Sequence, residues 1–89
     1  MSGHVLIVDD EKAICASLQG ILSDEGYEVS SAHDGEQALK GLEDEDPDLV
    51  LLDIWMPGMD GMEVLEQIKK RTPALPVIMI SGHGTVETA

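Results

Sequence analysis

The chain has 89 residues, enough for one small domain, and with one Trp, one Tyr and no Phe its core must be aliphatic. Its formal net charge of −13 excludes nucleic-acid binding by this segment, because phosphate contacts require Lys and Arg. No apolar run approaches the roughly 20 residues of a membrane span, and no signal-peptide pattern opens the chain, so no membrane contact is expected. A single cysteine, Cys15, is consistent with a cytoplasmic location.

The first third of the sequence alternates between strand and helix patterns. Residues 4–8 (HVLIV) are a short apolar run that predicts a buried strand. A helix is predicted over 11–25, where apolar residues recur at the spacing of one helical face: Ile14, Leu18, Ile21 and Leu22. Gly26 then stands where glycine commonly ends a helix. Residues 27–32 alternate between two faces, which is typical of a half-covered strand at the edge of a sheet.

The same alternation continues to the end of the chain. Asp34 is predicted to cap a helix that extends to about residue 45. Residues 49–54 are a second apolar run, typical of a strand buried on both faces. A helix over 62–71 and a third apolar strand over 76–81 follow, and the remaining residues predict a loop and the start of a helix. This order, βαβαβαβ, predicts an α/β fold with a parallel sheet and helices on both faces.

Acidic residues follow two of the predicted buried strands. Asp9 and Asp10 come directly after the first strand, and Asp53 lies near the end of the strand over 49–54. If these strands are neighbours, about 4.8 Å apart, the three carboxylates converge at the carboxyl edge of the sheet. Like charges so close need a counter-ion, and Mg²⁺ fits a site of few carboxylates, waters and phosphate oxygens. Asp10 and Glu11 alone also fit the cap and first turn of a helix, whereas Asp53 caps nothing.

Three segments place these acids in a known context: VDDE at 8–11, LLDIWMPGMDG at 51–61 and ISGHGT at 80–85. In this order and spacing they resemble the receiver domain of two-component response regulators. The sequence around Trp55 and the final residues SGHGTVETA are similar to those of receivers of the NtrX/NtrC type. Such receivers usually precede a sigma-54-activating ATPase and a DNA-binding module. The resemblance covers residues 1–89 and implies a flavodoxin-like, doubly wound sheet with strand order 2-1-3-4. The family's fifth strand, its last helices and a phosphoryl-contacting lysine are missing, so the domain is expected to be truncated.

The resemblance also implies a function and the residues that perform it. The chain would be a phosphoacceptor module, not an enzyme, that receives a phosphoryl group from a sensor histidine kinase in nitrogen and transcription regulation. Its metal ligands would be oxygen atoms that hold Mg²⁺: Asp10, Asp53 and the Trp55 carbonyl directly, and Asp9 through water. Asp53 would accept the phosphoryl group, and the Ser81 hydroxyl and the Gly82 amide would bond its oxygens. DNA binding is expected only in C-terminal domains that lie outside this segment.

Two other functions remain open at this point. One is a Mg²⁺-dependent phosphohydrolase with an aspartyl nucleophile, although such enzymes usually place a second acid two residues later, where this chain has Trp55. The other is an interaction fragment that does not signal, because the family's lysine is missing. The missing strand would leave Val77–Ile80 as an uncovered apolar edge, which predicts self-association. His4 is expected at the surface, and Cys15 is expected to be a packed residue.

Overall fold

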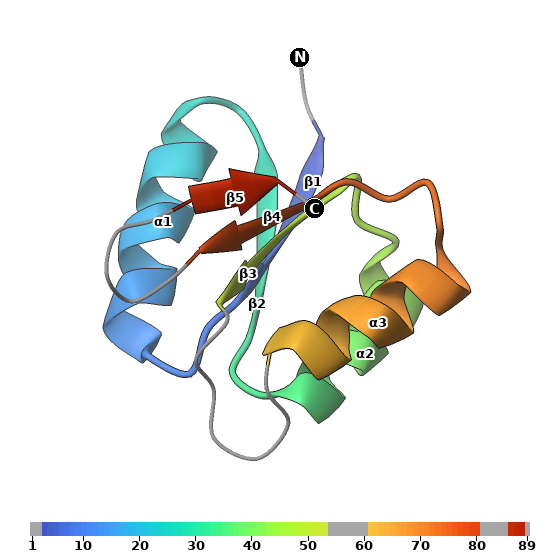
Figure 1. Ribbon diagram of the computed structural model, residues 1–89. Coiled ribbons are helices and arrows are strands. Elements are labelled where there is room, and N and C mark those ends of the chain that lie inside the picture. The colour runs from blue at the N-terminus through green and yellow to red at the C-terminus, as the bar shows by residue number, and fades with distance from the viewer. Residues whose placement is uncertain (1–2, 54–60, 81–85, 89) are drawn as a thin grey trace.

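The residues that the structure describes form a five-stranded sheet with helices on both faces (Figure 1). The structure is a computed structural model that describes residues 3–53, 61–80 and, as backbone, 86–88. In chain order the elements are β1 (His4–Val8), α1 (Lys12–Asp24), β2 (Glu28–Ala32), α2 (Gly35–Glu45), β3 (Leu49–Asp53), α3 (Gly61–Arg71), β4 (Val77–Ile80) and β5 (Val86–Thr88). The strands lie in the order β2-β1-β3-β4-β5.

The first four strands are parallel and confirm the predicted flavodoxin-like α/β fold with strand order 2-1-3-4. At the end of β1, Val8 pairs with Ala32 of β2 on one side and with Leu52 of β3 on the other. The alternating strand β2 lies at the outer edge, as predicted, and the apolar strands β1 and β3 lie inside. The residues that follow β1 and those that end β3 therefore meet at one edge of the sheet.

Two apolar clusters, one on each face of the sheet, form the core. Alternate strand residues such as Leu6, Val50 and Val77 pack toward α2 and α3, which supply Ala38 and Ile68. The intervening residues, Val5, Ile7, Leu49 and Leu51, form the second cluster with α1. Figure 1 shows α1 on one face of the sheet and the pair α2 and α3 on the other. β1 and β3 are thus covered on both faces, as their continuous apolar sequences predicted.

The buried face of α1 differs from the predicted stripe. Cys15 is 2% exposed, whereas Ile14 and Ile21 are 36% and 61% exposed. Leu18 and Leu22 are partly buried and pack with Cys15 against the sheet. The apolar period shows that α1 is amphipathic, but two neighbouring stripes share Leu18 and Leu22, and contact with Val5 and Ile7 selects the stripe that contains Cys15.

The end of the described chain is a strand, so the predicted helix start is wrong for residues 86–88. β5 pairs antiparallel with β4, with Ile80 opposite Val86 and Ile78 opposite Thr88. The free backbone groups at the edge of β4 favour a strand partner, and Val and Thr have high strand propensity. The edge of β4 is therefore covered by β5, and the prediction of an open edge that drives self-association is wrong in its premise.

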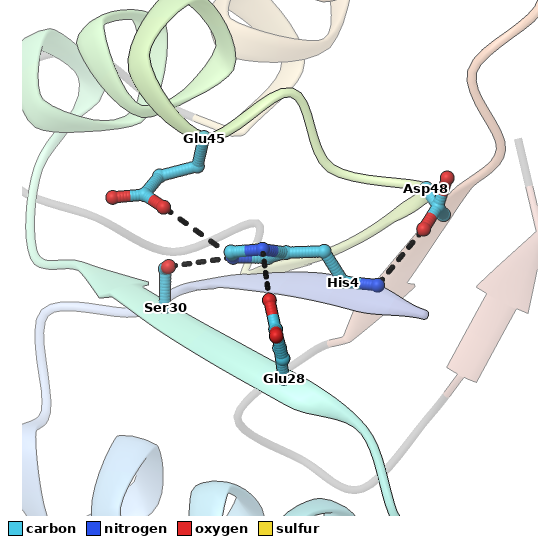
Figure 2. Close-up of polar contacts among 5 residues, drawn as sticks. All are labelled: His4, Glu28, Ser30, Glu45 and Asp48. Carbon is cyan, nitrogen blue, oxygen red and sulfur yellow. Dashed lines mark hydrogen bonds and ion pairs between the residues drawn. The ribbon is translucent and has the colours of Figure 1, made fainter. Parts of the chain in front are cut away.

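At the amino edge of the sheet, His4 of β1 contacts residues of β2 and α2 (Figure 2). Its side chain is only 16% exposed, so the expectation of a surface residue is wrong. Nε2 lies 2.7 Å from Ser30 Oγ on β2 and 3.8 Å from Glu45 Oε2 on α2, and Nδ1 lies 3.6 Å from Glu28 Oε2. The backbone N–H of His4 donates to Asp48 Oδ2 at 2.9 Å.

Candidate functional site: an acidic triad at the carboxyl edge

Three carboxylates from two neighbouring strands meet at the carboxyl edge of the sheet. Asp53 is the last residue of β3, and Asp9 and Asp10 directly follow β1. Because Val8 is paired with Leu52, the next residues on the two strands stand side by side. Asp9, Asp10 and Asp53 each offer a carboxylate oxygen, and these atoms lie within 4.8 Å of one another. The predicted convergence of these three acids is confirmed, and we call them the acidic triad.

The environment of the acidic triad favours a bound cation. Asp9 and Asp53 are only 5% and 7% exposed, whereas Asp10 faces solvent. Water therefore screens the repulsion between the Asp9 and Asp53 carboxylates poorly, and a cation among the three carboxylates would stabilise their charged forms. An all-oxygen donor set of this kind, open to solvent at Asp10, suits a hard divalent ion that retains some of its waters.

Helix capping does not account for the acids that follow β1. Glu11 occupies the N-cap position of α1, but its side chain makes no capping hydrogen bond. The Glu11 N–H instead donates to Asp9 Oδ1 at 2.9 Å, which fixes that carboxylate beside the sheet. Asp10 lies in the triad rather than at the cap. The alternative in which Asp10 and Glu11 only start a helix therefore leaves the position of Asp10 unexplained.

Two side chains that were not predicted as site residues contact the backbone carbonyl of Asp9. His33 Nδ1 lies 3.1 Å from the Asp9 carbonyl oxygen, and Cys15 Sγ donates to the same oxygen at 3.4 Å. Burial, together with the negative charge of Asp9, raises the pKa of the Cys15 thiol above its ordinary value of 9.0. The thiol therefore keeps its proton at neutral pH and is available as a donor. The signal for His33 was its place directly after β2, at the same edge of the sheet as Asp9.

Three predicted site residues lie outside the part of the chain that the structure describes: Trp55, Ser81 and Gly82. Their roles toward a metal ion and a phosphoryl group stay predictions. Elsewhere in the described residues, a pocket of about 210 Å³ is lined by Gly3, His4, Glu28 and Asp48. It lies at the amino edge, so the acidic triad does not line it. No helix in the described ranges is both long and apolar enough to span a membrane.

Comparison with known proteins identifies the family. The sequence model of the response regulator receiver domain matches residues 5–89. The chain belongs to the response regulator receiver family. The nitrogen assimilation regulatory protein NtrX of Azorhizobium caulinodans is 48% identical over 100% of this chain and 20% of its own length. A putative NtrX-like response regulator of Rickettsia bellii is 54% identical over 96% of this chain and 18% of its own. This receiver chain thus spans about a fifth of the length of these relatives.

Solved receiver structures share the fold. NtrX from Brucella abortus, crystallised with ADP, superposes with a TM-score of 0.90 at 51% identity, covering 94% of this chain and 20% of that protein. The separate receiver domain of the same protein gives 0.85 at 52% identity, over 90% of this chain and 68% of that one. TrrA from Thermotoga maritima, in complex with Mg²⁺-BeF, superposes with a TM-score of 0.85 at 41% identity. The match covers 91% of this chain and 72% of that one.

Proposed function

We propose that this receiver is the phosphoacceptor module of a two-component system, in which Asp53 accepts a phosphoryl group from a sensor histidine kinase with the help of Mg²⁺. The observation that carries the proposal is the acidic triad, with its carboxylate oxygens within 4.8 Å of one another. Membership of the receiver family and the Mg²⁺-BeF complex of TrrA support it. A longer chain would supply the transcriptional output, since this segment spans 20% of NtrX from A. caulinodans.

The three acids would bind the metal ion in two ways, directly or through a water. Asp10 and Asp53 would bind Mg²⁺ directly with the Trp55 carbonyl, and Asp9 would hold one of its waters. The 2.9 Å bond from the Glu11 N–H leaves the second oxygen of the Asp9 carboxylate for that water. Bound Mg²⁺ supplies positive charge against the negative charge of the transferring phosphoryl group. Ser81 and Gly82 would donate hydrogen bonds to the phosphoryl oxygens from the segment after β4.

The transfer itself needs only one nucleophile from this chain. A carboxylate oxygen of Asp53 would attack the phosphorus of a phosphohistidine in line with the phosphorus–nitrogen bond. That bond breaks, the imidazole keeps the electron pair and takes up a proton, and Asp53 becomes an acyl phosphate. Because Asp53 is only 7% exposed, its added charge must be met by the metal ion and by nearby donors. Attack of water on the acyl phosphate would return the carboxylate, so the chain's own chemistry is limited to gaining and losing this group.

Phosphorylation with a small phosphodonor tests the proposal. Acetyl phosphate with Mg²⁺ should add one phosphoryl group to the chain, and removal of Mg²⁺ with EDTA or the change Asp53→Asn should abolish the adduct in intact-mass spectra. Asp44→Asn is the matched control, because Asp44 is an exposed acid on α2 outside the triad. A Mg²⁺-dependent adduct that persists in Asp53→Asn would disprove the assignment of Asp53. Rapid turnover of phosphate esters would favour the phosphohydrolase, and no adduct under any condition would favour an interaction fragment.

A further inference from the structure

His33 lies between two elements that build the edge of the sheet. It directly follows β2 and precedes α2, and its side chain is half-buried. Its backbone is fixed by the first turn of α2, because the His33 N–H donates to Gln37 Oε1 at 2.9 Å. The neighbouring Asp34 caps the same helix by accepting from the Gln37 N–H at 2.8 Å. The imidazole therefore projects from a backbone that is anchored at both ends.

The contact with Asp9 favours one tautomer of the His33 ring. His33 Nδ1 lies 3.1 Å from the Asp9 carbonyl oxygen. Because a carbonyl oxygen only accepts hydrogen bonds, this contact is a hydrogen bond in the tautomer that carries the proton on Nδ1. In the other tautomer, Nδ1 would instead accept from the Cys15 thiol, whose Sγ lies 3.8 Å away. Cys15 Sγ, at 3.4 Å from the same oxygen, is a second donor. One backbone oxygen of the acidic triad is thus held by side chains from α1 and from the segment between β2 and α2.

This contact continues the sheet beyond its last strand pair. Val8 and Ala32 are the last paired residues of β1 and β2, and the Asp9 N–H donates to the Ala32 carbonyl at 3.0 Å. In a continuing parallel ladder, the Asp9 carbonyl would accept from the backbone of residue 34. The chain instead turns into α2 at Asp34, which serves as its N-cap. The imidazole of His33 takes the place of that missing backbone donor.

We propose that His33 is a positioning residue for the acidic triad, which it orients by holding the Asp9 carbonyl. The carbonyl of Asp9 and the N–H of Asp10 belong to one planar peptide unit. Fixing that oxygen therefore fixes the plane from which the Asp10 side chain departs, while the Glu11 N–H fixes the Asp9 carboxylate at 2.9 Å. Groups that do not bind the metal ion but hold its ligands in place by hydrogen bonds contribute substantially to metal affinity. The proposal rests on the proposed Mg²⁺ role of the triad.

Two substitutions separate the donor from the bulk of the ring. His33→Leu fills much of the volume of the ring but has no hydrogen-bond donor. We expect this variant to have a Mg²⁺ dissociation constant about tenfold higher than that of the wild type. His33→Asn places an amide N–H at nearly the distance of Nδ1 from the backbone, and most of the affinity should return. Isothermal titration calorimetry with MgCl₂ measures both constants, and urea unfolding in EDTA measures fold stability without the metal ion.

His4→Leu is the matched control, since His4 lies on the opposite edge of the same sheet and touches none of the triad. It should lower stability and leave the Mg²⁺ constant unchanged. Equal Mg²⁺ affinity in His33→Leu and wild type would overturn the positioning role alone. Absence of Mg²⁺ binding in the wild type would overturn this role, and unchanged affinity in Asp10→Asn would remove Asp10 from the proposed ligands.

A measurement on the unmodified chain keeps the proposal testable if a variant does not fold. Nitrogen-15 spectra of labelled histidine distinguish the two neutral tautomers, and His33 should carry its proton on Nδ1. A proton on Nε2 alone would remove the donor to Asp9 and overturn the proposal.

Discussion

His4 shows how much a single side chain can contribute at the edge of a parallel sheet. It is only 16% exposed and bonds Ser30 at 2.7 Å, so removing it breaks a part-buried contact between β1 and β2. We expect His4→Ala to lower the free energy of unfolding by about 1–3 kcal/mol, measured by urea denaturation in EDTA. Glu28→Gln is the control, because that side chain is 81% exposed and solvent screens its contact with His4. Equal losses in the two variants would show that the contact with Ser30 adds nothing.

Individual site residues were predictable where residue type and strand position coincided. Asp9, Asp10 and Asp53 are acids at the ends of apolar runs, and a parallel sheet brings such ends to one edge. For His33 the position directly after β2 was a signal, but its residue type and that of His4 did not specify the contacts they make. Their contacts depend on the register of β1 against β2, which pairs His4 with Glu28 and brings residue 33 level with Asp9. A strand pattern alone does not specify that register.

Glycines in α1 and α2 provide a test of how closely each helix approaches its neighbours. A Cβ at Gly41 of α2 would lie 3.3 Å from Leu6 Cδ1, whereas a Cβ at Gly20 of α1 would meet nothing within 4 Å. Gly20→Ala should therefore stabilise the fold by about 0.5–1 kcal/mol through helix propensity. The stabilisation by Gly41→Ala should be about 1 kcal/mol smaller than that by Gly20→Ala, because Leu6 is buried and must shift to make room for the new Cβ. Urea denaturation of both variants measures the difference, and equal stabilisation would show that Leu6 yields without cost.

Whole elements were predicted well where the sequence pattern was compatible with only one structure. The apolar runs of β1 and β3, and the Asp34 cap of α2, specified their elements directly. The face of α1 was predicted less well, because Cys15 lies on the buried stripe while Ile14 and Ile21 face outward. β5 was not predicted, because three residues are too short for a pattern and their strand conformation depends on the edge of β4. Tertiary contacts determine both which face of α1 is buried and that residues 86–88 form a strand.

At the scale of the whole molecule, the net charge of −13 makes stability sensitive to ions of two kinds. Any salt screens the overall self-repulsion, so NaCl should raise the melting temperature gradually. If Mg²⁺ is the cofactor as proposed, it should add a specific increase, because the acidic triad that would bind it forms only when β1 and β3 are paired. At a Mg²⁺ concentration of about 100 times the dissociation constant, this binding would contribute about 2.7 kcal/mol, or about 15 °C for a domain of this size.

Thermal unfolding followed by circular dichroism, with MgCl₂ and NaCl at equal ionic strength, separates the two effects. Asp10→Asn should unfold at a higher temperature than the wild type without Mg²⁺, because it relieves repulsion within the triad, and it should lose the Mg²⁺-specific increase. Asp44→Asn removes the same charge from the exposed surface of α2 and should retain that increase. If MgCl₂ and NaCl raise the melting temperature equally, the ions act only by screening. The three carboxylates would then be tolerated at the edge of the sheet without a bound cation.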